Sequence, residues 1–289
     1  MGILCGGYGV MKNNKLLICI LHYVVLVLIS LIFLFPFVYM FNKSLMTSTE
    51  INSLPVMFFP KAFHWENYSK CFDKEYLNYL LNTLIVVGFN VIVIPLASSF
   101  CAYGFARINF KGRDAVFMAV LSTIMLPGAV LQVPLYIIFN NLNWLNTLLP
   151  LTLPNILGGG VSNIFFVRQY IRSIPKEIDN AAKIDGATRY QIYFKIIIPL
   201  IVPVLTLIAV NTAIGCWSDF SGPLIYLRRS DVYTLALGIY YKFAGGDVTA
   251  STVNLQMALS VLTTLPMVVL FFCFQSKIIG GVAVSGIKA

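Results

Sequence analysis

Charged side chains are scarce in this sequence of 289 residues. They account for 11% of it, whereas 58% of the residues are hydrophobic. A soluble domain averages about 25% charged residues. So large a deficit excludes an ordinary soluble enzyme and predicts an integral membrane protein. The length suits several membrane spans with no added soluble domain.

Motifs for nucleotide or metal chemistry are also missing. There is no GxxxxGKS/T sequence, whose backbone N–H groups would hold phosphates. His22 and His64 lie far apart in the sequence and have no carboxylate company, which argues against metal or nucleophile chemistry. The six cysteines show no CxxC spacing, so neither a disulfide framework nor a zinc site is predicted. We expect a non-catalytic chain that binds no metal or cofactor and does not hydrolyse ATP itself.

What the sequence does contain is a series of six apolar segments long enough to cross a membrane. They are expected at residues 16–40, 76–106, 115–139, 148–167, 196–217 and 255–274. This predicts an all-α, polytopic membrane protein. Its parts would be a tail (1–15), a six-helix domain (16–274) and a second tail (275–289).

Proline and glycine interrupt the third and fourth segments, at Pro127-Gly128 and at residues 158–160. Broken helix is tolerated at membrane depth only inside protein or beside water. The breaks therefore indicate a central pathway through the membrane. For any single position, a packing kink or a close helix contact is the alternative explanation.

The basic residues are distributed unequally between the two sides of the membrane. With six spans, the side that holds both termini carries 13 of the 20 Lys and Arg residues and 4 of the 11 acidic residues. Its net charge is +9, and that of the opposite side is 0. The positive-inside rule then places the termini and the loop at 168–195 in the cytoplasm. The basic balance is explained by orientation, so no nucleic acid partner is predicted.

Polar side chains inside the expected spans are amides and hydroxyls. The candidates for a pathway lining are Asn82, Asn155, Asn163, Asn211 and Thr212. None of them is charged, whereas ion-driven transporters usually need a charged group inside the membrane. Such a lining suits a neutral, hydroxyl-rich solute. The alternative is hydrogen bonding between helices, worth about 0.6 kcal/mol on average.

One long charged stretch, residues 172–203, lies between two strongly apolar segments. Glu177 and Asp179 fall in the expected first turn of a helix, where the helix dipole favours negative charge. Gly186 can adopt the left-handed conformation that ends a helix. Thr188 is a plausible N-cap of a second helix that enters the next span. The stretch thus predicts a short helix, a glycine bend and a second helix.

Helical spacing gives the short helix one narrow apolar face. Ile178, Ala181 and Ala182 share this face, while Asp179 and Asn180 are expected to point elsewhere. Spacing alone leaves two roles open for it. The helix either rests on the lipid surface or docks on another protein, since alanine allows a close approach.

The sequence PKEIDNAAKIDGA at 175–187 resembles the cytoplasmic EAA loop of permease subunits of binding-protein-dependent ABC importers. Phe194, Ile197, Pro199 and Pro203 continue the match, and Asn180 stands where the family has a glutamate. The resemblance covers most of the chain and is nearest to the maltose-type sugar permeases. YGFARINFKGRD at 103–114 and WSDFSGPL at 217–224 also contribute to it.

This resemblance implies a type I ABC importer permease fold with six transmembrane helices, in the inner membrane of a bacterial cell. It implies a second homologous permease, two ATPase subunits that bind ATP and Mg²⁺, an extracytoplasmic solute-binding protein, and a sugar or oligosaccharide as substrate. By the same resemblance, ATPase coupling falls on Glu177, Asn180, Ala181, Ala182, Asp185, Gly186 and Ala187. Contact with the binding protein falls on Lys242, Phe243, Ala244, Gly245, Gly246 and Asp247.

Two other classes of function remain alternatives. An ion-gradient-driven secondary transporter or channel would work alone in liposomes, without ATP. The absence of a charged residue well inside an expected span argues against it. A purely structural membrane scaffold would have no solute-dependent activity.

Overall fold

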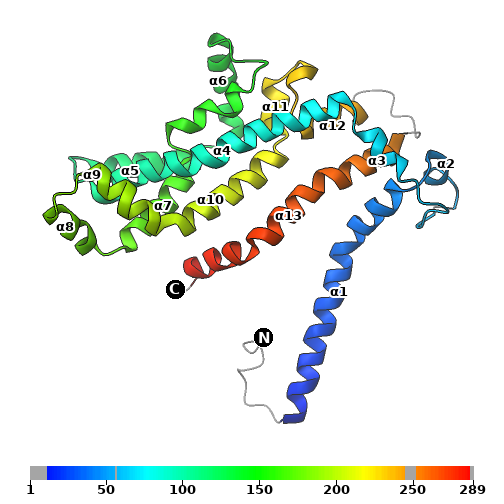
Figure 1. The fold of residues 1–289 in the computed structure, drawn as a ribbon, viewed down its shortest axis with the longest axis horizontal. Coiled ribbons are helices and arrows are strands. Elements are labelled where there is room, and N and C mark those ends of the chain that lie inside the picture. Colours follow the sequence, from blue (N-terminus) through cyan, green and yellow to red (C-terminus); the bar gives the residue numbers. More distant parts are fainter. Residues whose placement is uncertain (1–11, 56, 245–251, 287–289) are drawn as a thin grey trace. The chain divides into compact units, whose positions relative to one another are not determined.

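The computed structural model describes residues 12–55, 57–244 and 252–286. All regular secondary structure in this part of the chain is helical. The chain divides into two compact units, which in the described ranges comprise residues 12–72 with 252–265, and residues 73–244 with 266–286. We refer to them as unit 1 and unit 2 (Figure 1).

Unit 1 contains one long apolar helix, a following segment with two short helices, and the beginning of a second long helix. Its elements are α1 (Lys12–Ser44), α2 (Ser48–Ile51), α3 (Glu66–Cys71) and the beginning of α13 (Val253–Gly286). α2 begins at a capping box, in which Thr47 and Glu50 each bind the other's backbone N–H. The Asn254 amide of α13 donates to the Asn67 side chain of α3 at 3.3 Å, which ties the beginning of α13 to this unit.

Unit 2 is built around the long helix α4. Its elements are α4 (Lys74–Arg107), α5 (Arg113–Ser122), η1 (Thr123–Met125), α6 (Gly128–Asn141), η2 (Leu149–Leu151), η3 (Leu153–Leu157), α7 (Val161–Ser173), α8 (Lys176–Ile184), α9 (Arg189–Ile192), the π-helix η4 (Tyr193–Ile197), α10 (Ile198–Ser218), α11 (Ser221–Tyr226), η5 (Ser230–Val232), α12 (Leu235–Ala244) and the rest of α13. α7 and α10 both pack along α4 (Figure 1). Ala102 and Ala106 of α4 are buried there, because small side chains let helix backbones approach closely.

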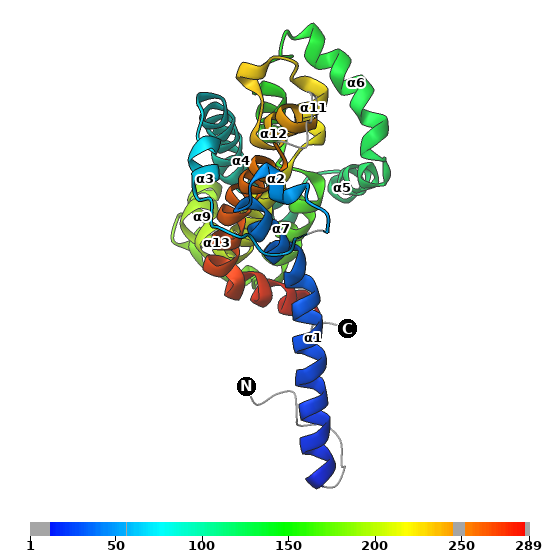
Figure 2. The same ribbon diagram turned by 90° about the vertical axis from the view of Figure 1, so that its right-hand side faces the viewer.

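Among the described residues, four helical segments are long and apolar enough to cross a membrane: Ile18–Ser44, Lys74–Arg107, Arg189–Ser218 and Val253–Gln275. They coincide with the first, second, fifth and sixth predicted spans. The third corresponds to the pair Arg113–Met125 and Gly128–Asn141, which is bent by 101° (Figure 2). The predicted break at Pro127 is confirmed. Leu126 before it is extended, because the proline ring disfavours the helical conformation at the preceding residue.

The fourth predicted span, 148–167, is not one helix. It consists of two short 3-10 segments, η2 and η3, followed by the first half of α7. Gly158, Gly159 and Gly160, which separate η3 from α7, all have positive φ angles, of 123°, 65° and 93°. Glycine adopts this conformation without steric cost. The all-helical architecture is as predicted, while a count of six spans stays a prediction.

Candidate functional site

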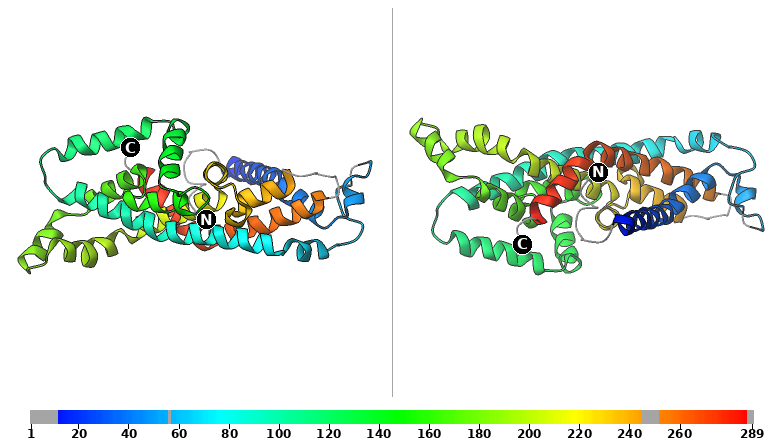
Figure 3. Two further views of the ribbon diagram at one scale, coloured as in Figure 1. Left: turned by 90° about the horizontal axis from the view of Figure 1, so that it is seen from above. Right: turned by 90° about the horizontal axis from the view of Figure 1, so that it is seen from below.

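The charged stretch after α7 forms the expected short helix and bend. α8 carries Glu177 and Asp179 in its first turn. Gly186 has φ +79°, and the Ala187 N–H donates to the Ala182 carbonyl at 2.9 Å, which closes the helix end. Thr188 caps α9 by a capping box with Gln191. α8 and α9 lie together at one end of unit 2 (Figure 3). We call residues 174–197 the α8–α9 segment.

The buried face of α8 differs from the prediction. Asp179 and Ala182 are the buried residues of this helix, whereas Ile178 and Ala181 are exposed. The prediction that Asp179 points away from the packed face is therefore wrong. The physical reason is a buried cation, Arg107, at the end of α4, which draws the carboxylate inward.

The ion pair between Arg107 and Asp179 is almost completely buried. Arg107 Nε lies 2.9 Å from Asp179 Oδ2, and the two side chains are 4% and 8% exposed. Arg107 also donates from its terminal nitrogen to the Ile174 carbonyl at 2.9 Å. The guanidinium thus binds both the residue that leads into α8 and the first turn of α8. Removing one partner of such a pair is strongly destabilising, because it leaves a buried charge unpaired.

Arg107 is one of three polar side chains that join α4 to the α8–α9 segment. Ser99, Tyr103 and Arg107 are four residues apart and therefore lie on one face of α4. Ser99 Oγ lies 2.8 Å from the Tyr193 hydroxyl, and the Tyr103 hydroxyl donates to the Arg189 carbonyl at 3.2 Å. We call these three residues the α4 ladder. It spans two helical turns and fixes α8, α9 and the beginning of η4 to one helix.

The π-helix η4 connects this segment to α10. The Ile198 N–H donates to the Tyr193 carbonyl, which is the i to i+5 bond of a π-turn. Pro199 follows directly, and a proline in an α-helix clashes with the carbonyl four residues earlier. The wider turn accommodates this proline within an otherwise continuous helix. It also places Tyr193 against Ser99.

A small polar cavity of about 180 Å³ lies beneath α8. Its lining residues are Tyr103, Arg107, Ile108, Asn109, Asp179, Lys183, Arg189 and Ile192. Three of them are cationic and one is acidic. Arg107 Nη1 and Asp179 Oδ1 are buried, and neither has a hydrogen-bond partner in the described part of the chain. The cavity has room for ordered water at these atoms.

The seven residues expected to couple to an ATPase therefore fall into two groups. Ala182 is buried and Ala187 is half-buried. Both therefore pack against the core of the permease itself and do not face outward. Glu177, Asn180, Ala181, Asp185 and Gly186 are exposed. Ile184 was not among the seven, yet it is 87% exposed. The sequence shows an isoleucine two residues before Gly186, at the expected helix end, but only the structure shows that it is exposed.

At the opposite end of α4, three of the residues expected to contact a binding protein belong to α12: Lys242, Phe243 and Ala244. Lys242 forms an ion pair with Asp73, the N-cap of α4. Burial alone would raise the pKa of Asp73, but its hydrogen bonds to Lys242 and to the Tyr76 N–H, together with the charge of Lys242, lower it. Phe243 is buried and so gives no exposed contact. Ala244 ends α12, and Gly245, Gly246 and Asp247 lie outside the described residues.

Three of the five expected pathway residues hold the fold together. The Asn82 amide donates to the carbonyls of Asp231 and Tyr233, both at 3.0 Å. Asn155 donates to the Asn90 side chain at 2.9 Å, and Asn163 to the Gly159 carbonyl at 2.7 Å. For these amides the contacts favour the structural alternative. Asn211 is exposed and Thr212 is half-buried.

The family model for the inner membrane component of binding-protein-dependent transport systems matches residues 94–283. The chain belongs to this family. It is 33% identical, over 90% of its length and 93% of the other protein's, to the arabinooligosaccharide transport permease AraQ of Halalkalibacterium halodurans. It is 30% identical to the melibiose/raffinose/stachyose import permease MelC of Bacillus subtilis, over 88% of this chain and 91% of that one.

A solved bacterial ABC transporter that imports alginate contains a chain with the same fold. The TM-score is 0.81 at 21% sequence identity, over 93% of this chain and 99% of that one. The type I permease fold implied by the EAA-loop resemblance is thereby confirmed. The family match covers the C-terminal half of α4, the α8–α9 segment and α10, so the α4 ladder lies within the matched part of the chain.

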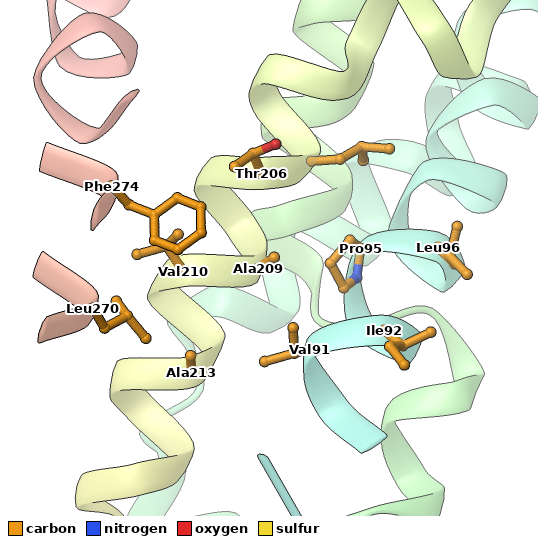
Figure 4. A pocket seen from close by; sticks show the side chains of 11 residues that line it. Val91, Ile92, Pro95, Leu96, Thr206, Ala209, Val210, Ala213, Leu270 and Phe274 are labelled. Carbon is orange, nitrogen blue, oxygen red and sulfur yellow. The ribbon is translucent and has the colours of Figure 1, made fainter. Parts of the chain in front are cut away.

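The permease also has an open groove of about 500 Å³ between α4, α10 and the later part of α13. Figure 4 shows Val91 and Pro95 of α4 on one side of α10, facing Ala209 and Ala213, and Phe274 of α13 next to Val210. Thr206 supplies the one hydroxyl of its lining, and this hydroxyl donates to the Val202 carbonyl at 2.9 Å. A hydroxyl-rich solute would find few hydrogen-bond partners in it.

Proposed function

We propose that this permease carries a sugar or oligosaccharide across a bacterial inner membrane as a non-catalytic subunit of an ATP-driven importer. It would do so with a second homologous permease, two ATPase subunits that bind ATP and Mg²⁺, and an extracytoplasmic solute-binding protein. Relatives named for arabinooligosaccharide and melibiose/raffinose/stachyose transport support the substrate class. With six spans, the charge distribution supports cytoplasmic termini.

The observation that carries this proposal is the attachment of α8 to α4. One face of α8 is fixed to α4 through Asp179 and Arg107, while Ile184 and Asp185 at its end stay exposed. A helix that is rigidly attached on one side and exposes an isoleucine at its end suits the transfer of force from a partner. In the proposed mechanism, closure of the ATPases moves α8. The α4 ladder then moves the inner end of α4, and the pathway switches from inward-facing to outward-facing.

Co-purification and uptake in liposomes test this function. We expect an ATPase and a second permease to purify with the chain. In liposomes that contain the complex and its binding protein, uptake of sugar should require ATP and persist after ion gradients are collapsed. Uptake by this chain alone, driven by an ion gradient, would instead establish the secondary transporter or channel. If neither the complex nor the chain alone showed any solute-dependent activity, the structural scaffold would be the remaining explanation.

The Gly186→Val variant should lose most transport with little effect on membrane insertion. Gly186 has φ +79° and no atom within 4 Å of an added Cβ, so the change acts through the backbone alone. The left-handed conformation costs valine roughly 1–2 kcal/mol or more. Relaxation of this strain should change the orientation of α9 relative to α8. Gly186→Asn is the matched control, because asparagine tolerates the conformation. Equal uptake by both variants at equal expression would contradict a fixed α8.

Ile184→Ser should weaken the binding of the ATPase to the permease. Burying an isoleucine contributes about 1.5–3 kcal/mol, so its loss should raise the dissociation constant roughly 10- to 100-fold. Asn180→Glu, on the same helix, should leave binding unchanged, since Asn180 is exposed and the family has a glutamate at this position. The measurement is titration of the detergent-solubilised permease pair with purified ATPase. Wild-type affinity in the serine variant would place the docking surface elsewhere.

A further inference from the structure

An apolar loop in unit 1 lies against the end of α1. Residues 57–65 have the sequence MFFPKAFHW, in which Lys61 is the one lysine, arginine or acidic residue. Four of its aromatic side chains are exposed: Phe58, Phe59, Phe63 and Trp65. Phe59 is 74% exposed and Trp65 is 60% exposed. We call residues 57–65 the aromatic loop. Exposed aromatic rings concentrated in one short segment indicate a surface that contacts a protein or a membrane.

The aromatic loop is fixed to the last turns of α1. Lys43 is buried, and its ammonium donates to the Met57 carbonyl at 2.9 Å. The His64 N–H donates to the Leu45 carbonyl at 3.1 Å. Ring contacts join Tyr39 to Phe58 and Phe41 to Trp65, with centroids 6.5 Å and 6.3 Å apart. The loop is therefore held beside α1 and does not extend away from its end.

These contacts set the depth of the loop in the membrane. α1 is apolar from Leu16 to Phe41, a stretch of about 39 Å at 1.5 Å per residue. This length exceeds the hydrocarbon core of about 30 Å and approaches the full bilayer of about 40–45 Å. Tyr39 and Phe41, at the polar end of the stretch, therefore lie in the headgroup region. Rings packed on them lie at the same level.

We propose that the aromatic loop rests in the headgroup region of the bilayer, with its exposed rings in contact with phospholipid. Aromatic side chains favour this zone, because it accepts their apolar rings beside polar groups. Lys61 adds a cation suited to lipid phosphate. The exposed surface of the loop is also continuous with the exposed side chains of α1, which face lipid in a membrane-spanning helix. The loop would fix how deeply the Ser44 end of α1 sits.

Fluorescence quenching by brominated phospholipid tests this placement. The complete transporter complex is reconstituted with lipids brominated either high on the acyl chain or near its end, and with unbrominated lipid as the control. The difference in emission between wild type and Trp65→Phe isolates the signal of Trp65. The conservative replacement keeps a ring against Phe41. We expect the largest loss of the Trp65 signal with bromine close to the headgroup.

Addition of saturating binding protein separates lipid contact from protein contact. We expect the quenching of Trp65 to be unchanged by it. Equal Trp65 emission in all three lipids would overturn the proposal. Quenching that disappears when the binding protein is added would also overturn it, because the aromatic loop would then be a protein-docking surface. Neither outcome bears on whether the permease transports sugar.

Discussion

Arg107→Leu and Asp179→Leu should each abolish transport, and the double variant should restore it in part. Each single change leaves a buried charge without its partner, which costs about 3–5 kcal/mol. α8 has nine residues and two buried side chains, so it has little other binding energy to oppose such a loss. We expect α8 to detach from α4 in both single variants. The rate of ATP hydrolysis by a complex that contains either single variant should then be the same with and without solute.

The double variant removes both charges and replaces them with apolar side chains. Such replacements are often neutral or stabilising, so the melting temperature of the complex should return to that of the wild type or exceed it. Transport should recover in part, because α8 is again held on α4 but without the ion pair. The measurements are melting temperature, ATPase rate and uptake, made on the same preparations.

Lys183→Leu is the matched control for this cycle. Lys183 lines the same cavity as Arg107 and Asp179 but is itself exposed, so its removal leaves no buried charge unpaired. It should transport at a rate close to that of the wild type. Normal uptake in either single variant would show that force reaches the membrane helices by another route. A stable, assembled double variant as inactive as the single ones would show that the charges themselves are needed.

The parts of this site that were predictable are those fixed by neighbouring residues. The bend at Gly186 and the capping box at Thr188 depend on backbone chemistry within a few residues, so the sequence contains their full cause. The break at Pro127 is local for the same reason. Asp179 was placed wrongly because its partner, Arg107, belongs to a helix far away in the sequence. Helical spacing favoured an alanine face and gave no sign of a buried cation.

Polar residues at membrane depth show the same limit. The sequence identified Asn82 and Asn155 as unusual, but two explanations were open for each. The hydrogen-bond partners decide between the two explanations. Asn82 donates to the Asp231 carbonyl, and Asn155 donates to the Asn90 side chain. No spacing rule connects such pairs. The glycines at 158–160 marked an interruption correctly. The start of α7 directly after these glycines, at Val161, was not predicted.

Gly159→Ala should strongly destabilise unit 2, although it adds only one methyl group. A Cβ added at Gly159 would lie 2.4 Å from the Ile94 carbonyl oxygen and 3.1 Å from two further backbone atoms of Ile94. Backbone cannot move aside as a flexible side chain can, so α4 and the glycine turn must separate. Overpacking of this kind costs about 1–3 kcal/mol, and alanine at φ +65° adds roughly 1–2 kcal/mol.

Gly88→Ala and Gly104→Ala on α4 are the matched controls. An added Cβ at either position meets no atom within 4 Å. Alanine in a helix interior is favoured over glycine by about 0.8–1.0 kcal/mol. These two variants should therefore be as stable as the wild type or more so, while Gly159→Ala should melt lower and accumulate less in the membrane. A wild-type yield and melting temperature for Gly159→Ala would contradict the close contact with Ile94.

The way in which Gly159→Ala destabilises the permease also separates the two explanations of the glycine turn, a central pathway and a close helix contact. The space beside Gly159 is filled by the backbone of α4, and the Gly159 carbonyl accepts the Asn163 amide. No room for a solute remains on this side of the turn. A pathway-lining glycine would change which solutes are carried while the fold stayed intact. For Gly159→Ala we expect the reverse: the remaining folded complex should carry the same solutes as the wild type, in smaller amounts.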